Sequence, residues 1–288
     1  MTVSPSQPAS RSLVSTQWLA EHLDAPDIVV VDGSYYLPTQ KRNAREEYLA
    51  GHIPGAVFFD VDEVADHASD LPHMLPRPEA FSLAMRERGI GDGAAIVVYD
   101  GAGLFSAARV WWTFKIFGVR DVYVLDGGLP KWKAERRPIE FGEIRRTPRH
   151  FTARFDHGAV ASRTDVQKAL AAGGAQVVDA RSAERFAGTA PEPRPGLPSG
   201  HMPGARNVPF NDLVEDGRLV PAHRIAETFR KAGVDPDKPV ITTCGSGVTA
   251  AVLWLGLDAL GKPPKSLYDG SWTEWASHPD AEIEPKPK

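Results

Sequence analysis

The stretch Gly51-His52-Ile53-Pro54-Gly55-Ala56 returns later in the chain as Gly200-His201-Met202-Pro203-Gly204-Ala205. Two further stretches return in the same order and at nearly the same separation, Val30-Val31-Asp32 as Val177-Val178-Asp179 and Leu125-Asp126-Gly127 as Tyr268-Asp269-Gly270. Ordered matches at a nearly constant separation indicate an internal repeat. The chain of 288 residues is therefore predicted to contain one unit of about 140 residues, duplicated and fused.

Each half shows the same order of helical and strand-like segments. They are expected at residues 17–23, 28–31, 79–88, 95–99 and 122–125, and again at 165–170, 176–178, 222–232, 240–243 and 265–268. Ser15 and Ser162 stand at the expected N-caps of the first helices, and Ser162 and Asp165 have the spacing of a capping box. Short apolar strands that alternate with helices are typical of a parallel sheet covered on both faces. The predicted fold class is α/β in both halves, with domains over residues 12–135 and 159–280 and a linker over 136–158.

The composition excludes several classes of protein. The 33 basic and 37 acidic residues give a formal net charge of -4, so we expect no surface for nucleic acid or anionic membranes. No apolar run approaches the roughly 18 residues of a membrane-spanning helix. The polar first residues lack the apolar segment of a secretory signal. We therefore expect a cytoplasmic protein.

Cys244 is the only cysteine in the chain, which excludes an intramolecular disulfide and a multi-cysteine zinc site. Aligning the halves places Thr243-Cys244-Gly245-Ser246-Gly247 opposite Tyr99-Asp100-Gly101-Ala102-Gly103, at the end of a central strand. Ligands bind at this edge of a parallel sheet. Glycines let backbone N–H groups turn inward, and the following helix adds partial positive charge. Such surroundings stabilise a thiolate, so Cys244 is predicted to be a nucleophile rather than a small buried apolar residue.

These residues resemble the rhodanese-type sulfurtransferases, and within that family the 3-mercaptopyruvate sulfurtransferases, over residues 15–277. The resemblance implies two tandem rhodanese-like domains, each a parallel sheet flanked by helices. It implies that the first domain is catalytically inactive, because Asp100 replaces the cysteine, and that the second is catalytic. Thiosulfate-preferring relatives carry cationic residues directly after the cysteine, where this chain has Gly245 and Ser246.

The resemblance also assigns roles to individual side chains. The arginines that bind the substrate carboxylate match Arg185 and Arg194, and guanidinium forks suit the carboxylate of an α-keto acid. A proton relay proposed in relatives corresponds to Asp62, His73 and Ser246, so the first domain is expected to reach over the active loop.

Backbone N–H groups of the loop after the cysteine would hold the outer sulfur atom, which assigns a binding role to Gly245, Gly247, Val248 and Thr249. No metal ion and no organic cofactor is implied. His52 and His201 recur in both halves although only one half has a thiol. We therefore predict that these histidines hold the turn and do not catalyse.

The expected reaction is a double displacement. Cys244 takes sulfur from 3-mercaptopyruvate, pyruvate leaves, and the persulfide passes its sulfur to reduced thioredoxin, a small thiol or dithiol, or cyanide. Thiosulfate is expected as a secondary donor. Two alternatives stay open: a thiosulfate sulfurtransferase on the same scaffold, and a non-catalytic sulfur-carrier or regulatory module.

Three other motif matches are weak. Residues 245–250 fit a dinucleotide fingerprint, but too few residues follow them to complete a nucleotide-binding sheet. Residues 256–262 fit a phosphate-loop pattern, but Pro263 replaces the Ser or Thr that would hold magnesium. A cysteine phosphatase of this fold needs an arginine where this chain has Ala250.

Overall fold

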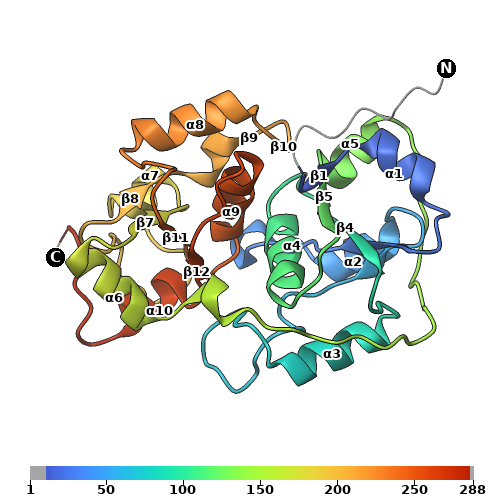
Figure 1. Ribbon diagram of the computed structural model, residues 1–288, viewed down its shortest axis with the longest axis horizontal. Coiled ribbons are helices and arrows are strands. Elements are labelled where there is room, and N and C mark those ends of the chain that lie inside the picture. The colour runs from blue at the N-terminus through green and yellow to red at the C-terminus, as the bar shows by residue number, and fades with distance from the viewer. Residues whose placement is uncertain (1–10, 286–288) are drawn as a thin grey trace.

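The computed structural model describes residues 11–285, and this part of the chain forms two parallel five-stranded sheets, one in each half (Figure 1). The first sheet has the order β1-β5-β4-β2-β3 and the second the order β6-β12-β11-β7-β8, so the topology repeats strand for strand. The predicted α/β fold class is confirmed in both halves. Residues 1–10, where we expect no secretory signal, lie outside the described residues.

The central strands are the longest and the most deeply buried. The first sheet consists of β1 (Leu13–Val14), β2 (Ile28–Asp32), β3 (Val57–Phe58), β4 (Ala95–Tyr99) and β5 (Val122–Leu125). The second consists of β6 (Val160–Ala161), β7 (Gln176–Asp179), β8 (Arg206–Asn207), β11 (Val240–Thr243) and β12 (Ser266–Tyr268). A small antiparallel pair, β9 (Val214–Glu215) and β10 (Arg218–Leu219), is inserted into the second half.

Helices cover both faces of each sheet. In the first half they are α1 (Thr16–His22), α2 (Ala44–Ala50), α3 (Pro78–Glu87), α4 (Ala107–Ile116) and α5 (Gly128–Ala134). In the second they are α6 (Arg163–Ala172), α7 (Ala183–Phe186), α8 (Ala222–Lys231), α9 (Ala250–Ala259) and α10 (Ser271–Ser277). Short 3-10 turns occupy Pro38–Gln40, His157–Ala159 and Phe210–Leu213. Ser15 Oγ accepts the N–H of Trp18, and Ser162 forms a capping box with Asp165, so both predicted N-caps are confirmed.

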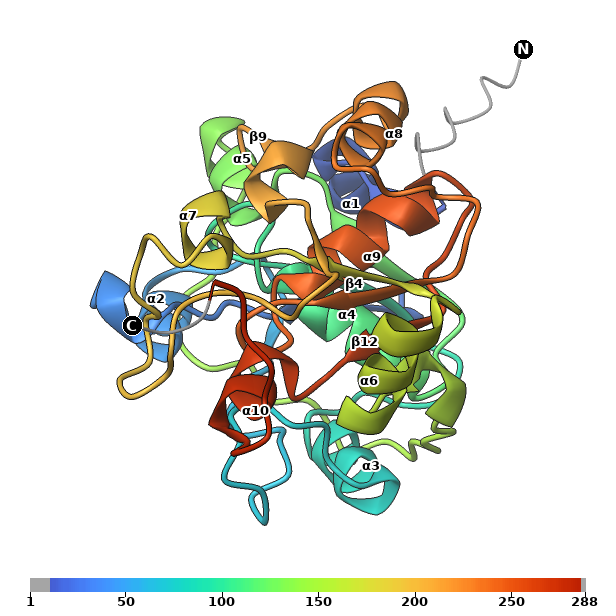
Figure 2. The same cartoon turned by 90° about the vertical axis from the view of Figure 1, so that its left-hand side faces the viewer.

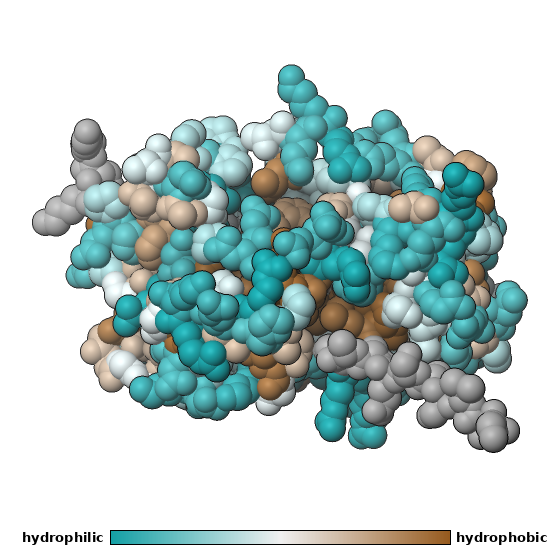
Figure 3. Space-filling view, turned by 90° about the horizontal axis from the view of Figure 1, so that it is seen from above, coloured by the Kyte–Doolittle hydropathy of each residue, from teal (hydrophilic) through white to brown (hydrophobic). Residues whose placement is uncertain are grey.

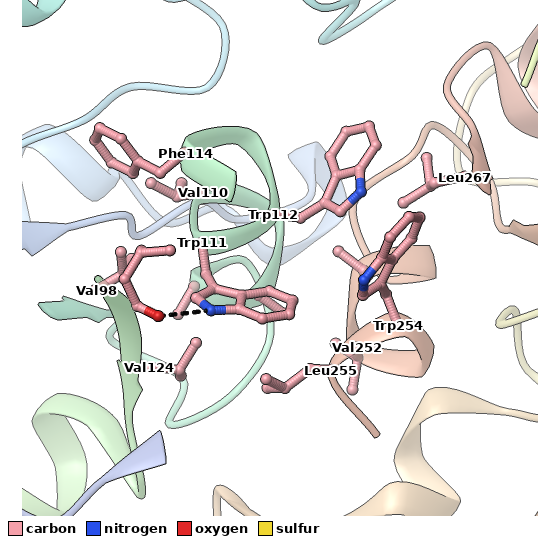
Figure 4. Packing of buried hydrophobic residues seen from close by; sticks show 14 of the residues in the cluster. Val98, Val110, Trp111, Trp112, Phe114, Val124, Val252, Trp254, Leu255 and Leu267 are labelled. Atoms are coloured by element: carbon pink, nitrogen blue, oxygen red, sulfur yellow. Dashed lines mark hydrogen bonds between the residues drawn. The ribbon is translucent and has the colours of Figure 1, made fainter. Parts of the chain in front are cut away.

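One hydrophobic core joins the two halves. Helices α4 and α9 lie side by side between the sheets (Figures 1 and 2), and their buried residues belong to the same cluster. Trp112 and Trp254 pack across this contact with ring centroids 5.9 Å apart (Figure 4). Trp111 Nε1 donates to the carbonyl of Val122 at 3.0 Å, which anchors α4 on the first sheet. Because both helices begin directly after the two equivalent loops, this packing fixes the first half relative to the Cys244 loop.

The outer face of each sheet packs against helices of its own half. Leu19 and Trp132 lie in a cluster under α1 and α5, and Val166 and Trp272 lie in one under α6 and α10. The segment between the halves runs back along the first one in an extended conformation. Its residue Arg154 donates a backbone hydrogen bond to the carbonyl of Phe117 at 2.8 Å, so the segment is fastened to the end of α4.

The surface seen from above is mainly hydrophilic, and apolar residues are visible chiefly in a hollow near the middle of this face (Figure 3). Among residues 11–285, no helix has both the length and the apolar character that crossing a bilayer requires.

Candidate active site

Cys244 lies between β11 and α9, at the C-terminal edge of the second sheet, and is 2% exposed. Its backbone N–H donates to Ser271 Oγ at 3.2 Å, and its carbonyl accepts the N–H of Trp272 at 2.9 Å. Ser271 Oγ in turn donates to the carbonyl of Tyr268 at 2.8 Å. The first residues of α10 therefore fix the backbone of the predicted nucleophile.

The loop after Cys244 carries unused backbone donors. In the part of the chain that the structure describes, the N–H groups of residues 245–249 donate to no protein acceptor. Gly247 has a φ of +79°, and a Cβ at this position would lie 2.9 Å from Arg109 Nη1. Only glycine fits this curl of the backbone. Together with the N-terminus of α9, these groups can stabilise an anion on residue 244.

The equivalent loop of the first half shows what such N–H groups bind. The carboxylate of Asp100 accepts the N–H groups of Ala102, Phe105 and Ala107 at 2.9, 2.7 and 2.8 Å. The first two of these donors correspond to those of Ser246 and Thr249 in the second half. In the first half, the loop therefore holds an anion at its first residue.

Arg185 reaches the Cys244 loop from α7. A Cβ at Gly245 would lie 2.8 Å from Arg185 Nη2, so the guanidinium and the loop are in close contact. Nε and Nη2 of Arg185 donate to Oε1 and Oε2 of Glu192 at 3.2 and 2.5 Å. The Glu192 side chain is only 2% exposed. The predicted carboxylate-binding arginine is thus positioned by a buried carboxylate of the protein itself.

Arg181 continues this arrangement into the core. Its Nη1 donates to Glu192 Oε1 at 2.8 Å, and its Nε and Nη2 donate to Asp179 Oδ2 at 2.9 and 2.6 Å. The guanidinium lies 4.3 Å from the centroid of the Trp272 ring. Because Asp179 ends β7, the charges around Arg185 are anchored to the sheet.

Arg194, His73 and Asp62 form a chain of contacts between the two halves. Arg194 Nη2 lies 3.0 Å from His73 Nε2, and His73 Nδ1 lies 2.5 Å from Asp62 Oδ1. Because arginine can only donate, Nε2 accepts, and this contact assigns the ring proton to Nδ1 and makes His73 neutral. The hydrogen bond from His73 holds the pKa of Asp62 below its ordinary value, against the opposing effect of burial.

Ser246 is placed differently. It is 5% exposed, and no hydrogen bond joins its hydroxyl to His73 among residues 11–285. The structure therefore brings Asp62 and His73 together, as the predicted relay requires, but Arg194 faces the ring nitrogen that Ser246 would need.

Arg109 of α4 ties the first half to the active loop. Its Nη1 lies 2.7 Å from Asp269 Oδ1 and donates to the carbonyl of Gly247 at 3.3 Å, while its Nη2 donates to the carbonyl of His73 at 2.7 Å. Asp269 Oδ2 accepts the N–H of Leu75 at 2.9 Å. The expectation that the first half reaches over the active loop is confirmed by these contacts.

Sequence reasoning assigned no role in sulfur transfer to Arg109, Asp269, Arg181 or Glu192. One signal was available for Arg181, which stands where the first half has Ser34 although the preceding Asp32 and Asp179 are the same. A charged residue gained in only one repeat marks the half whose site differs.

The two repeated histidines make matching contacts in their turns. His52 Nδ1 lies 2.9 Å from the carbonyl of Tyr48, on whose ring it stacks at 4.3 Å. His201 Nδ1 lies 2.8 Å from the carbonyl of Phe186, on whose ring it stacks at 3.9 Å. These contacts hold the turns, as predicted. Among residues 11–285, no three His, Cys, Asp or Glu side chains are grouped so as to hold a metal ion.

Both repeats match one known domain. The rhodanese-like domain matches residues 15–135 and again residues 162–278. The chain belongs to the rhodanese family. Of its two rhodanese domains, only the second carries a thiol at the loop between the central strand and the following helix.

Relatives in this family are similar to the chain over nearly its whole length. The 3-mercaptopyruvate sulfurtransferase of Escherichia coli (strain K12) is 48% identical over 273 residues, which cover 94% of this chain and 97% of that protein. The 3-mercaptopyruvate sulfurtransferase of Homo sapiens is 43% identical over 272 residues, 92% of each chain. The crystal structure of SseA from Escherichia coli has a TM-score of 0.84 at 46% identity, covering 90% of this chain and 98% of that one. The resemblance inferred from the sequence is confirmed.

Proposed function

We propose that this rhodanese chain transfers sulfur from 3-mercaptopyruvate to a thiol acceptor through a persulfide on Cys244, with release of pyruvate. The observation that carries the proposal is the position of Cys244. It begins a loop whose backbone N–H groups donate to no acceptor among residues 11–285, and the Arg185 guanidinium lies against that loop. The relatives named 3-mercaptopyruvate sulfurtransferase support this donor, and so do the uncharged Gly245 and Ser246.

In the first half-reaction the Cys244 thiolate attacks the sulfur atom of the donor. A sulfur–sulfur bond forms, the carbon–sulfur bond of the donor breaks, and its electron pair passes to the enolate of pyruvate. Arg185 and Arg194 hold the donor carboxylate. Glu192 engages only part of the Arg185 fork, and the remaining N–H groups of the five can bind the carboxylate.

The enolate carbon must gain a proton before pyruvate leaves. We assign its delivery to Ser246, with His73 and Asp62 behind it. Because Arg194 Nη2 faces His73 Nε2, the relay can form only when the donor carboxylate draws Arg194 away. Donor binding and assembly of the relay are coupled in this proposal.

In the second half-reaction the outer sulfur is held by the backbone N–H groups of Gly245, Gly247, Val248 and Thr249. An acceptor thiolate attacks this sulfur, the persulfide bond breaks, and the Cys244 thiolate is restored. A dithiol such as reduced thioredoxin can then close its own disulfide and release hydrosulfide, whereas cyanide leaves as thiocyanate. The chemistry uses no metal and no organic cofactor.

We assign catalysis to the second domain, residues 159–280, and treat the first, residues 12–135, as inactive. The Asp100 carboxylate already occupies the N–H groups of its loop, and it cannot form a persulfide. A thiolate that is regenerated in every turnover needs reducing surroundings, which supports a cytoplasmic location.

Steady-state kinetics with 3-mercaptopyruvate and with thiosulfate, with cyanide as the common acceptor, tests the proposal. We expect kcat/KM to be higher for 3-mercaptopyruvate by at least about tenfold, or roughly 1.4 kcal/mol. A preference for thiosulfate would favour the alternative donor within the same family. Turnover of neither donor would favour a non-catalytic carrier module.

A further inference from the structure

Glu192 is a buried carboxylate among the charges that face the donor. It accepts from Arg185 Nη2 at 2.5 Å and from Arg181 Nη1 at 2.8 Å, and its side chain is 2% exposed. A carboxylate that loses its water in this way needs a counter-charge, and these two guanidinium groups supply it. Neither the family resemblance nor the proposed reaction gives Glu192 a role.

The charged side chains around the Cys244 thiolate cancel one another. One series consists of Asp179, Arg181, Glu192 and Arg185, alternates in sign, and sums to zero. A second series consists of Asp62, the neutral His73 and Arg194, and also sums to zero. These side chains therefore offer two guanidinium forks to the donor, but they bring no net positive charge to the site.

This balance distinguishes the two donors by charge. 3-Mercaptopyruvate brings one carboxylate charge, and thiosulfate brings two negative charges. The Cys244 thiolate adds a negative charge to these balanced side chains, so the second charge of a dianion meets repulsion and loses water without gaining a counter-charge. We infer that Glu192 determines specificity, because its negative charge makes the site prefer a monoanionic donor to a dianionic one. The inference rests on the proposed function and adds to it the physical basis of donor choice.

Glu192→Gln removes the negative charge of this residue and keeps the shape of its side chain. The glutamine amide oxygen can still accept a hydrogen bond from Arg181 or Arg185, but the side chain brings no charge. A cation introduced at Gly245 would not be an equivalent test, because a Cβ there lies 2.8 Å from Arg185 Nη2. Glu184→Gln is the matched control, since it removes the same charge from an exposed position of α7 next to Arg185.

The measured quantity is the ratio of kcat/KM for thiosulfate to kcat/KM for 3-mercaptopyruvate. We expect Glu192→Gln to raise this ratio by about fivefold or more, because the lost charge lies in a poorly screened place. Glu184→Gln should change it by less than about twofold, since water and salt screen an exposed charge. A purely structural role for Glu192 would lower both kcat/KM values together, and an unchanged ratio would overturn the inference.

If Glu192→Gln does not fold, as judged by circular dichroism, inhibition of the wild-type protein tests whether the site prefers a monoanion. Pyruvate, a monoanion, should inhibit competitively at a lower concentration than oxalate, a dianion of similar size. Equal or tighter inhibition by oxalate would overturn the inference. Failure of the proposed function is a separate result, in which the wild type turns over neither donor and the inference falls with it.

Discussion

Arg109 of the first domain and Asp269 of the second form a buried ion pair, with 2.7 Å between Nη1 and Oδ1 and side-chain exposures of 3% and 4%. Arg109 also holds the carbonyls of His73 and Gly247. His73 has a φ of 60°, a left-handed conformation that is uncommon for residues other than glycine. One ion pair therefore fixes both the loop that carries His73 and the loop that carries Cys244.

Arg109→Met should destabilise the protein by about 3–5 kcal/mol, because it leaves the Asp269 carboxylate buried without a counter-charge. The double variant Arg109→Met with Asp269→Leu should recover part of this loss, since no unpaired charge remains. Urea unfolding followed by tryptophan fluorescence measures both effects. A single variant that unfolds at the wild-type urea concentration would show that the pair does not hold the domains together.

Cys244→Ser should abolish sulfur transfer and leave the fold intact. A serine hydroxyl is not ionised at neutral pH and forms no persulfide, while its volume suits the buried site. Mass spectrometry after treatment with 3-mercaptopyruvate should detect one added sulfur on the wild type and none on the variant. Because the chain has one cysteine, a wild type that stays unmodified would end the persulfide mechanism.

The sequence predicted the parts of the fold that repeat or that form long apolar runs. The expected strands at residues 95–99 and 240–243 are β4 and β11, and the expected helix at residues 222–232 is α8, Ala222–Lys231. The strands β1, β3, β6 and β8 have two residues each, too few to show any periodicity. Helices α2 and α10 have seven residues, about two turns, which is too short for a clear apolar stripe. Helix α1 is equally short, but its Ser15 N-cap marked its start.

The site could be predicted only as far as the residues that the family resemblance names. Glu192, the partner of Arg185, is only seven residues away in the sequence, but His73, the partner of Arg194, comes from the first half of the chain. Arg109 sits in a mostly apolar helix, and its ion pair with Asp269 spans the two halves. Long-range pairing of buried charges leaves no local pattern in a sequence.

Asp32 provides a test of pH dependence. It ends β2 as Asp179 ends β7, but it has Ser34 where Asp179 has Arg181. Burial raises the pKa of Asp32 to about 6, against the hydrogen bonds from Ser34 and Tyr99 that lower it. The folded protein therefore binds more protons than the unfolded chain between about pH 4 and 6, and the free energy of unfolding falls as pH rises through this window.

Asp32→Asn should remove this dependence, because asparagine keeps a side-chain oxygen for the Ser34 N–H and does not titrate. We expect the variant to gain stability over the wild type as pH rises from 4 to 7, by roughly 3 kcal/mol at most. Asp179→Asn should instead lower the stability of the folded protein at pH 7, since it removes the negative charge that faces Arg181. Urea unfolding at several pH values checks both, and a gain for Asp32→Asn that is the same at every pH would contradict the assignment.

Arg185→Ala tests the carboxylate clamp, and the structure indicates that the variant folds, because Glu192 keeps its hydrogen bond from Arg181. Charge-assisted hydrogen bonds contribute roughly 1.5–3 kcal/mol when shielded from water. We therefore expect kcat/KM for 3-mercaptopyruvate to fall about 10- to 100-fold, largely through KM if the contact is equal in ground and transition states. Arg194→Ala should lose a similar or smaller factor.

Measuring the two half-reactions separately distinguishes a loss of carboxylate binding from a general disturbance of the Cys244 loop. Arg185→Lys should recover only part of the kcat/KM that Arg185→Ala loses, since an ammonium group cannot reproduce the guanidinium fork. Removal of sulfur from preformed Cys244 persulfide by a neutral thiol should hardly change in Arg185→Ala, because that step holds no donor carboxylate. If Arg185→Ala is slow in both half-reactions, the role of Arg185 is to hold the Cys244 loop in place and not to bind the donor carboxylate. Wild-type turnover of 3-mercaptopyruvate by both alanine variants would place the donor carboxylate elsewhere.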